Sequence, residues 1–167
     1  GRLAAAALLN VACFNLFAVF AQLAMPASRA AILTFTMPFW GALLGWLVLS
    51  ERIDRLRALS LLLGALGLGA LVVPFWPVIA AGGVPYGLVY VLGAAITWAA
   101  GTVCMKKFPI AADPLAVTAW QVAIAALACA LGAVLFETPR FALSDPKVLG
   151  AFVYHITLPQ ALSYALW

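Results

Sequence analysis

The sequence predicts an all-α integral membrane protein, a polytopic bundle of helices. Apolar residues make up 67% of the chain and charged residues 8%, whereas soluble domains average roughly 45–50% and about 25%. The apolar residues gather in runs of the length, about 20 residues, that a helix needs to cross a hydrocarbon core. These runs lack the alternation of outer-membrane barrel strands. Lipid is therefore the expected solvent.

Six apolar runs follow one another along the chain, and charged or proline- and glycine-rich segments separate them. They cover approximately residues 3–25, 30–50, 58–74, 84–105, 114–136 and 148–167. The third run is expected to end in a turn-rich patch around Pro74 and Pro77. Because the chain begins without methionine and ends inside an apolar run, we expect it to be a segment of a longer protein.

Side-chain amides mark the first run. Asn15 and Gln22 lie seven residues apart and share a helix face, while Asn10 is displaced from that face by about 140°. Amides in hydrocarbon are costly unless they face protein or water, so we expect them to point into the bundle. Hydrogen bonds between helices would also explain them.

The second run is interrupted by Pro38. Proline has no backbone N–H, so the carbonyl of Thr34 loses its helical partner, and the hydroxyls of Thr34 and Thr36 can partly satisfy this region. At about 1.5 Å per residue, Pro38 lies roughly 12 Å into the run, near the middle of the membrane. Transporters place interrupted helices there, along the substrate path. A kink without function is an equally open reading.

Small residues on the second and third runs offer packing faces. Gly41 and Gly45 form a G-x-x-x-G pattern, and Gly64, Gly67 and Gly69 follow on the next run. Helices in lipid associate where small residues let their backbones approach closely. We therefore assign these glycines to packing and not to function.

The fourth and sixth runs carry further polar groups. A single helical stripe on the fourth run, with Trp98 beside it, comprises Tyr86, Tyr90, Gly93, Thr97, Gly101 and Cys104. In the sixth run His155 and Gln160 flank Pro159. Any one of these residues is explained by a hydrogen bond between helices. Polar groups on three helices together favour a polar-lined cavity.

The basic residues predict an orientation. One side of the membrane would hold Arg2, Arg52, Arg55, Arg57, Lys106 and Lys107, and the other Arg29, Arg140 and Lys147. The richer side is expected to be cytoplasmic. This places the loops at 51–57 and 106–113 in the cytoplasm. Glu51 is expected to act there as an interfacial cap or to pair with Arg55, four residues on.

Several classes of function are disfavoured. Acidic and basic residues all lie at the ends of runs or in loops, and His155 is the one titratable candidate of a proton pump within a run. Serine-hydrolase, zinc-protease and P-loop motifs are missing. Cys13, Cys104 and Cys129 lie in apolar runs, as small buried hydrophobes do. We therefore expect no catalytic residue, metal or cofactor, and no nucleic-acid partner for the net charge of +4.

Four segments, taken in order, resemble the EamA-type drug/metabolite transporter superfamily. They are MPFWGALLGWLVLSER, then RLRALSLLLGALGLGALVV, then GAAITWAAGTVCMKKF, and finally SYALW, which is similar to the eighth helix of amino-acid-exporting relatives. The family usually has Gly-Glu where this chain has Ser50-Glu51. A ninth helix, which would repeat the Pro38 helix, is not found in this sequence.

The resemblance implies a ten-helix fold of two inverted five-helix repeats. Residues 1–77 would hold the last three helices of the first repeat, and residues 78–167 the first three of the second. The central substrate cavity would be lined by Asn15, Pro38, Trp40, Tyr90, Trp98 and His155. Trp98 is the closest match to the family's motif.

The function implied is transport of small metabolites, amino acids or related amphipathic compounds, by alternating access and most naturally as export. The expected setting is a bacterial inner membrane, and the expected partners are a small-molecule substrate and the lipid bilayer. Aromatic side chains would supply stacking or cation–π contacts. The rival interpretation is a membrane scaffold or assembly subunit that transports nothing. An intramembrane enzyme ranks third.

Overall fold

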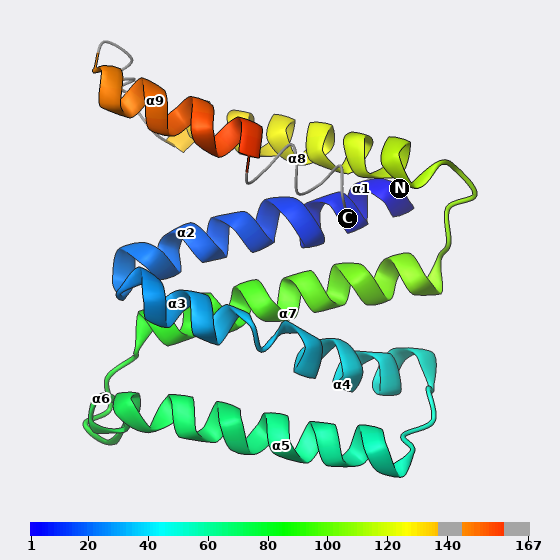
Figure 1. Cartoon of the computed structure of the whole chain (residues 1–167), viewed down its shortest axis with the longest axis vertical. Coiled ribbons are helices and arrows are strands. Elements are labelled where there is room, and N and C mark those ends of the chain that lie inside the picture. Colours follow the sequence, from blue (N-terminus) through cyan, green and yellow to red (C-terminus); the bar gives the residue numbers. More distant parts are fainter. Residues whose placement is uncertain (137–144, 159–167) are drawn as a thin grey trace.

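The structure, a computed structural model, describes residues 1–136 and 145–158, and these residues form helices joined by short links (Figure 1). The elements are α1 (Arg2–Ala7), the π-helical turn η1 (Leu8–Cys13), α2 (Phe14–Ala24), α3 (Ala27–Thr34), α4 (Met37–Leu49), α5 (Arg55–Val72), the 3-10 turn η2 (Val73–Phe75), α6 (Trp76–Ala80), α7 (Tyr86–Lys107), α8 (Pro114–Phe136) and α9 (Pro146–His155). Arg140, Pro159 and Gln160 lie outside the described residues.

The all-α, multi-pass prediction is confirmed. Helices long and apolar enough to cross a membrane cover Arg2–Ala24, Ala27–Leu49, Arg55–Ala80, Tyr86–Lys107 and Pro114–Leu135. These correspond to the first five apolar runs. The sixth run begins in α9, and the rest of it lies outside the described part of the chain.

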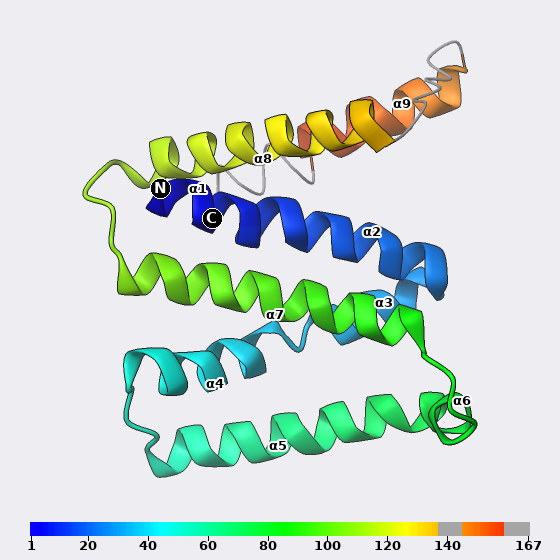
Figure 2. The same cartoon turned by 180° about the vertical axis from the view of Figure 1, so that it is seen from behind.

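Helix α7 occupies the centre of the bundle. It packs against α1, η1 and α2 on one side and against α3 and α4 on the other. In both views α5 lies at one edge, next to α4, while α8 lies toward the opposite edge, next to the first span (Figures 1 and 2). The fourth run is therefore the element that the other spans are built around.

Small residues on α7 allow the closest helix approaches. A Cβ added at Gly101 would lie 2.5 Å from Asn10 Oδ1, and one at Gly93 would lie 3.2 Å from the Phe17 ring. Gly64 on α5 similarly meets Phe39 at 3.0 Å. Among the described residues the predicted packing face at Gly41 has no partner, because none of their heavy atoms lies within 4 Å of a Cβ built there.

The predicted interruption of the second run is confirmed. Helix α3 ends at Thr34 and α4 begins at Met37, so the break precedes Pro38 by a few residues. The Thr36 hydroxyl donates to the Leu33 carbonyl at 2.7 Å, and the Thr34 hydroxyl donates to the Ala30 carbonyl at 2.8 Å. These two bonds reinforce the last turn of α3, and neither goes to the carbonyl of Thr34, the group that Pro38 leaves without a helical partner.

The third span is longer than expected. Instead of a turn after Pro74, the chain continues through η2 and α6 to Ala80. Pro74 and Pro77 both lie in the first turn of a short helix, where a missing N–H costs nothing. The expected boundary between repeats, after residue 77, therefore falls inside α6.

Ser50 ends α4 in the left-handed conformation, with φ 54° and ψ 34°. Glycine is the usual residue at this position of a helix terminus. The departure from Gly-Glu noted in the sequence thus lies where the backbone favours glycine. It leaves Glu51 directed back toward Gly45, 3.5 Å from the position of an added Cβ.

Candidate functional site

A pocket of about 370 Å³ with a mixed polar and apolar lining lies between η1, α7 and α8. We call it the Trp98 pocket, and its polar and aromatic lining comprises Asn10, Trp98, Thr102, Thr118 and Gln121. Asn10 lies eight residues after the start of its span, about 12 Å in at ~1.5 Å per residue. The pocket therefore reaches well into a hydrocarbon core of about 30 Å.

Asn10 lines this pocket from η1, a π-helical turn. Such turns recur at functional sites in otherwise α-helical segments. Asn10 packs against Gly101 and its Oδ1 accepts a long hydrogen bond, 3.5 Å, from the Thr102 hydroxyl. Its Nδ2 donates to no group within the described residues, so this donor is available to a ligand.

Gln121 is the second amide of the pocket, and the sequence interpretation missed it. It is 8% exposed, and its Nε2 donates to the sulfur of Met105 at 3.5 Å, a weak acceptor. Its Oε1 accepts no hydrogen bond from the part of the chain described. Gln121 is the one side-chain amide in the run 114–136, and that was the signal that could have identified it.

The lining of the Trp98 pocket carries no charged side chain. Its side chains include no acid, base or thiol, and Ile110 and Ala112 bring the loop after α7 to its mouth. The polar groups that the pocket presents are an amide donor, an amide acceptor and a half-buried indole.

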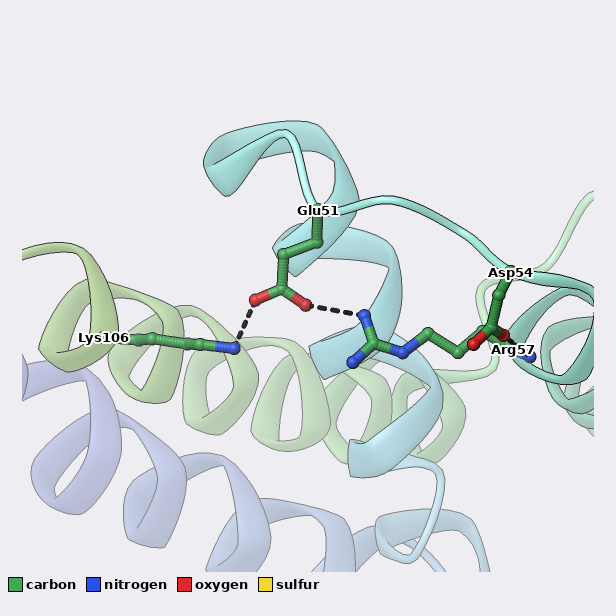
Figure 3. Close-up of polar contacts among 4 residues, drawn as sticks. All are labelled: Glu51, Asp54, Arg57 and Lys106. Carbon is green, nitrogen blue, oxygen red and sulfur yellow. Dashed lines mark hydrogen bonds and ion pairs between the residues drawn. The ribbon is translucent and has the colours of Figure 1, made fainter.

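An ionic network joins three helix ends at one end of the bundle (Figure 3). Glu51, just after α4, accepts a hydrogen bond from Arg57 of α5 at 3.0 Å and another from Lys106 of α7. The predicted pairing of Glu51 with Arg55 is wrong, because Glu51 pairs with Arg57 and Lys106 instead. Asp54 caps α5 by accepting from the backbone N–H of Arg57 at 2.8 Å.

Cation–π contacts mark both ends of the bundle. The Arg2 guanidinium lies 5.0 Å from the Phe108 ring centroid, near the Glu51 network, and that of Arg29 lies 5.8 Å from the Phe75 ring at the opposite end. The basic residues assigned to one side thus lie at one end. The loops predicted at residues 51–57 and 106–113 cover residues 50–54 and 108–113 in the structure, because α5 begins earlier and α7 ends later than expected. That this end is cytoplasmic stays a prediction.

The network perturbs the titration of Glu51. The hydrogen bond from Lys106 lowers the pKa of Glu51 most, partial burial opposes this, and the charges of Lys106 and Arg57 lower it further. A folded pKa below the unfolded value stabilises the fold above the ordinary glutamate pKa, about 4.3. That stabilisation is lost as the pH falls through the lowered folded value.

We expect Glu51→Gln to lower the melting temperature slightly at pH 7, because exposed ion pairs contribute little. At a pH below the lowered folded pKa of Glu51 the difference from the wild type should vanish, since the carboxylate is then protonated in both the folded and the unfolded state. Thermal unfolding in detergent at both pH values measures this. Arg52→Gln, which removes a charge without an ion pair, is the control. A difference that stays the same at low pH would contradict the network's role.

The structure places the six predicted cavity residues apart. Trp98 lines the pocket described above, Pro38 lines a groove between α4 and α5, and Trp40 lines an apolar pocket beside Trp76. The indole N–H of Trp40 is buried without a hydrogen-bond partner in the described structure.

The other three occupy different positions again. Asn15 donates to the carbonyl of Val11 in its own helix at 2.7 Å, and Tyr90 packs on Phe20 with ring centroids 5.6 Å apart. His155 is exposed on α9. Within residues 1–136 and 145–158 these side chains do not line one common pocket, so their shared role in a cavity stays a prediction.

Comparison with known proteins gives three findings. Residues 1–73 and 85–167 match the EamA-like transporter family. Over 123 residues the chain is 30% identical to "Uncharacterized transporter YvbV" of Bacillus subtilis (strain 168), covering 71% of this chain and 38% of that protein. The chain thus spans well under half the length of this relative. No solved structure matches it.

Proposed function

The chain belongs to the EamA-like transporter family, and from this premise we propose that its protein exports small amphipathic metabolites, amino acids among them, by alternating access. The observation that supports a substrate site is the Trp98 pocket. It offers an unpaired amide donor, an amide acceptor and an indole inside a membrane span.

A pocket without charged side chains suits zwitterions and uncharged metabolites. A charged substrate would need a fixed counter-charge in the membrane, and such residues are rare because they are costly there. In this chain the acidic and basic side chains lie at span ends or in loops. The pocket would therefore accept a range of small ligands, orienting them by hydrogen bonds and holding them by stacking.

Alternating access requires contacts that break when one end opens. The pair between Glu51 and Lys106 joins residues of the two proposed repeats, 1–77 and 78–167. The family match also falls in two segments, separated by residues 74–84, which supports this division. We propose that this arrangement, with Glu51 and Lys106 paired, is the state in which the charged end is closed. The positive-inside rule predicts that this end is cytoplasmic.

Counterflow in liposomes tests the proposal. The purified protein, reconstituted in vesicles loaded with unlabelled amino acids, is expected to accumulate the same labelled amino acids faster than protein-free vesicles do. Saturation of the rate with substrate would indicate a binding site. A membrane scaffold or assembly subunit predicts rates equal to those of the empty vesicles, for amino acids and for other small amphipathic metabolites alike.

A further inference from the structure

A long groove separates α4 from α5. Its volume is about 580 Å³, and Phe39, Leu61, Leu68 and Leu71 form its apolar wall. Helix α5 packs mainly against α4 and has no buried residue in the described structure. We call this feature the α4–α5 groove.

The groove is long enough for an acyl chain. From Arg57 to Leu71 it follows α5 for about 21 Å, at ~1.5 Å per residue, which exceeds the ~15 Å of one leaflet.

Hydroxyl groups in the groove are already bonded. The Thr36 hydroxyl donates to the Leu33 carbonyl at 2.7 Å, and the Ser60 hydroxyl donates to the Leu56 carbonyl at 3.0 Å. Since both donors are used within their own helices or turns, the interior of the groove is apolar toward an occupant. This favours a hydrocarbon chain over a polar solute.

The mouth of the groove is basic. At this end Arg57 and Glu51 line the groove, Arg52 lines the adjoining surface pocket, and both Arg57 and Lys106 pair with Glu51 (Figure 3). Arg52 and Arg55 form no ion pair in the described part of the chain. Trp46, which is 47% exposed, lines both the groove and the surface pocket that contains Arg52. Tryptophan and basic residues together are typical of the headgroup level of a membrane.

We propose that the α4–α5 groove binds one anionic phospholipid. Its phosphate lies against Arg52 and Arg57, and one acyl chain follows the apolar wall toward Leu71. Basic pockets between membrane helices bind anionic headgroups because the positive charges attract them at the surface. The arginines would hold the headgroup, and the apolar wall of the groove would hold the acyl chain along a path longer than one leaflet.

Native mass spectrometry of the intact protein, purified with equal amounts of phosphatidylglycerol and phosphatidylcholine, tests the proposal. We expect one phosphatidylglycerol to be retained in preference to phosphatidylcholine. Replacing Arg52 and Arg57 by glutamine, singly and together, should weaken retention about fivefold for each charge removed. Arg29→Gln, at the opposite end of the bundle, is the charge-matched control and should retain the lipid.

A second pair of variants tests the acyl chain. Gly67 lines the groove and Gly69 the pocket beside Trp76, and a Cβ at either position meets nothing within 4 Å. Gly67→Leu should displace the lipid, and Gly69→Leu should not. Equal retention of both lipids, retention independent of the arginines, or a cross-link from Gly67→Cys to another segment of the protein would each overturn the proposal. None of these measurements depends on transport.

Discussion

Replacing Gly101 by alanine is expected to destabilise the bundle by about 1–3 kcal/mol, the usual cost of overpacking a tight contact. The added Cβ would lie 2.5 Å from Asn10 Oδ1 and 2.9 Å from the backbone nitrogen of Asn10. The side chain can rotate away, but the backbone nitrogen moves only if η1 and α7 separate. Thermal unfolding in detergent, or unfolding by added SDS, measures the change.

The matched control is Gly41→Ala. A Cβ at Gly41 meets no heavy atom within 4 Å, so the substitution should be neutral or slightly stabilising, because alanine favours helix more than glycine does. If both variants unfolded at the same temperature, the contact between η1 and α7 would be looser than the structure indicates. Because Gly101 also positions Asn10, the variant is expected to reshape the Trp98 pocket.

The spans and the break in the second of them could be predicted from the sequence. Length and apolarity decide whether a segment crosses lipid, and the proline removes a helical hydrogen bond whatever its neighbours are. Both features are local to a single helix. The prediction consequently succeeded for the first five runs and for the interruption between Thr34 and Met37.

The candidate site depends on features that are not local. The face rule placed Asn15 and Gln22 together and displaced Asn10, but the π-helical turn of η1 changes the register, and Asn10 is the amide that meets α7. Composition does not mark such a turn. The choice among Gly41, Gly93 and Gly101 likewise depends on which helix lies opposite, and the sequence of one helix does not contain that information.

The ion pair of Glu51 is a similar case. Helical spacing suggests Arg55, yet residues 51–54 are not helical, so the four-residue rule does not apply there. The long-range partner Lys106 follows from α7 packing beside α4. The distribution of basic residues nevertheless predicts that the loops holding Glu51 and Lys106 lie on the same side of the membrane. The contact between these two residues agrees with that prediction.

Trp98→Ala is expected to reduce amino-acid counterflow by about tenfold. A tenfold change corresponds to about 1.4 kcal/mol, which lies within the range of aromatic contacts with a desolvated ligand. The indole lines the pocket and is half-buried, so its removal takes away the stacking surface while Asn10 and Gln121 stay in place. Initial rates over a range of substrate concentrations separate weaker binding from slower turnover. Weaker binding, seen as a higher KM, is the expected main effect.

Trp120→Ala is the matched control, because Trp120 adjoins Gln121 on α8 but is 62% exposed. It removes the same side chain from an exposed position on α8 and should leave counterflow unchanged. Both variants need the same melting temperature and monodisperse elution as the wild type, which separates loss of the site from loss of the fold. If well-folded Trp98→Ala and Trp120→Ala proteins both transport at the wild-type rate, substrates bind elsewhere, and the Trp98 pocket only packs η1 against α7 and α8.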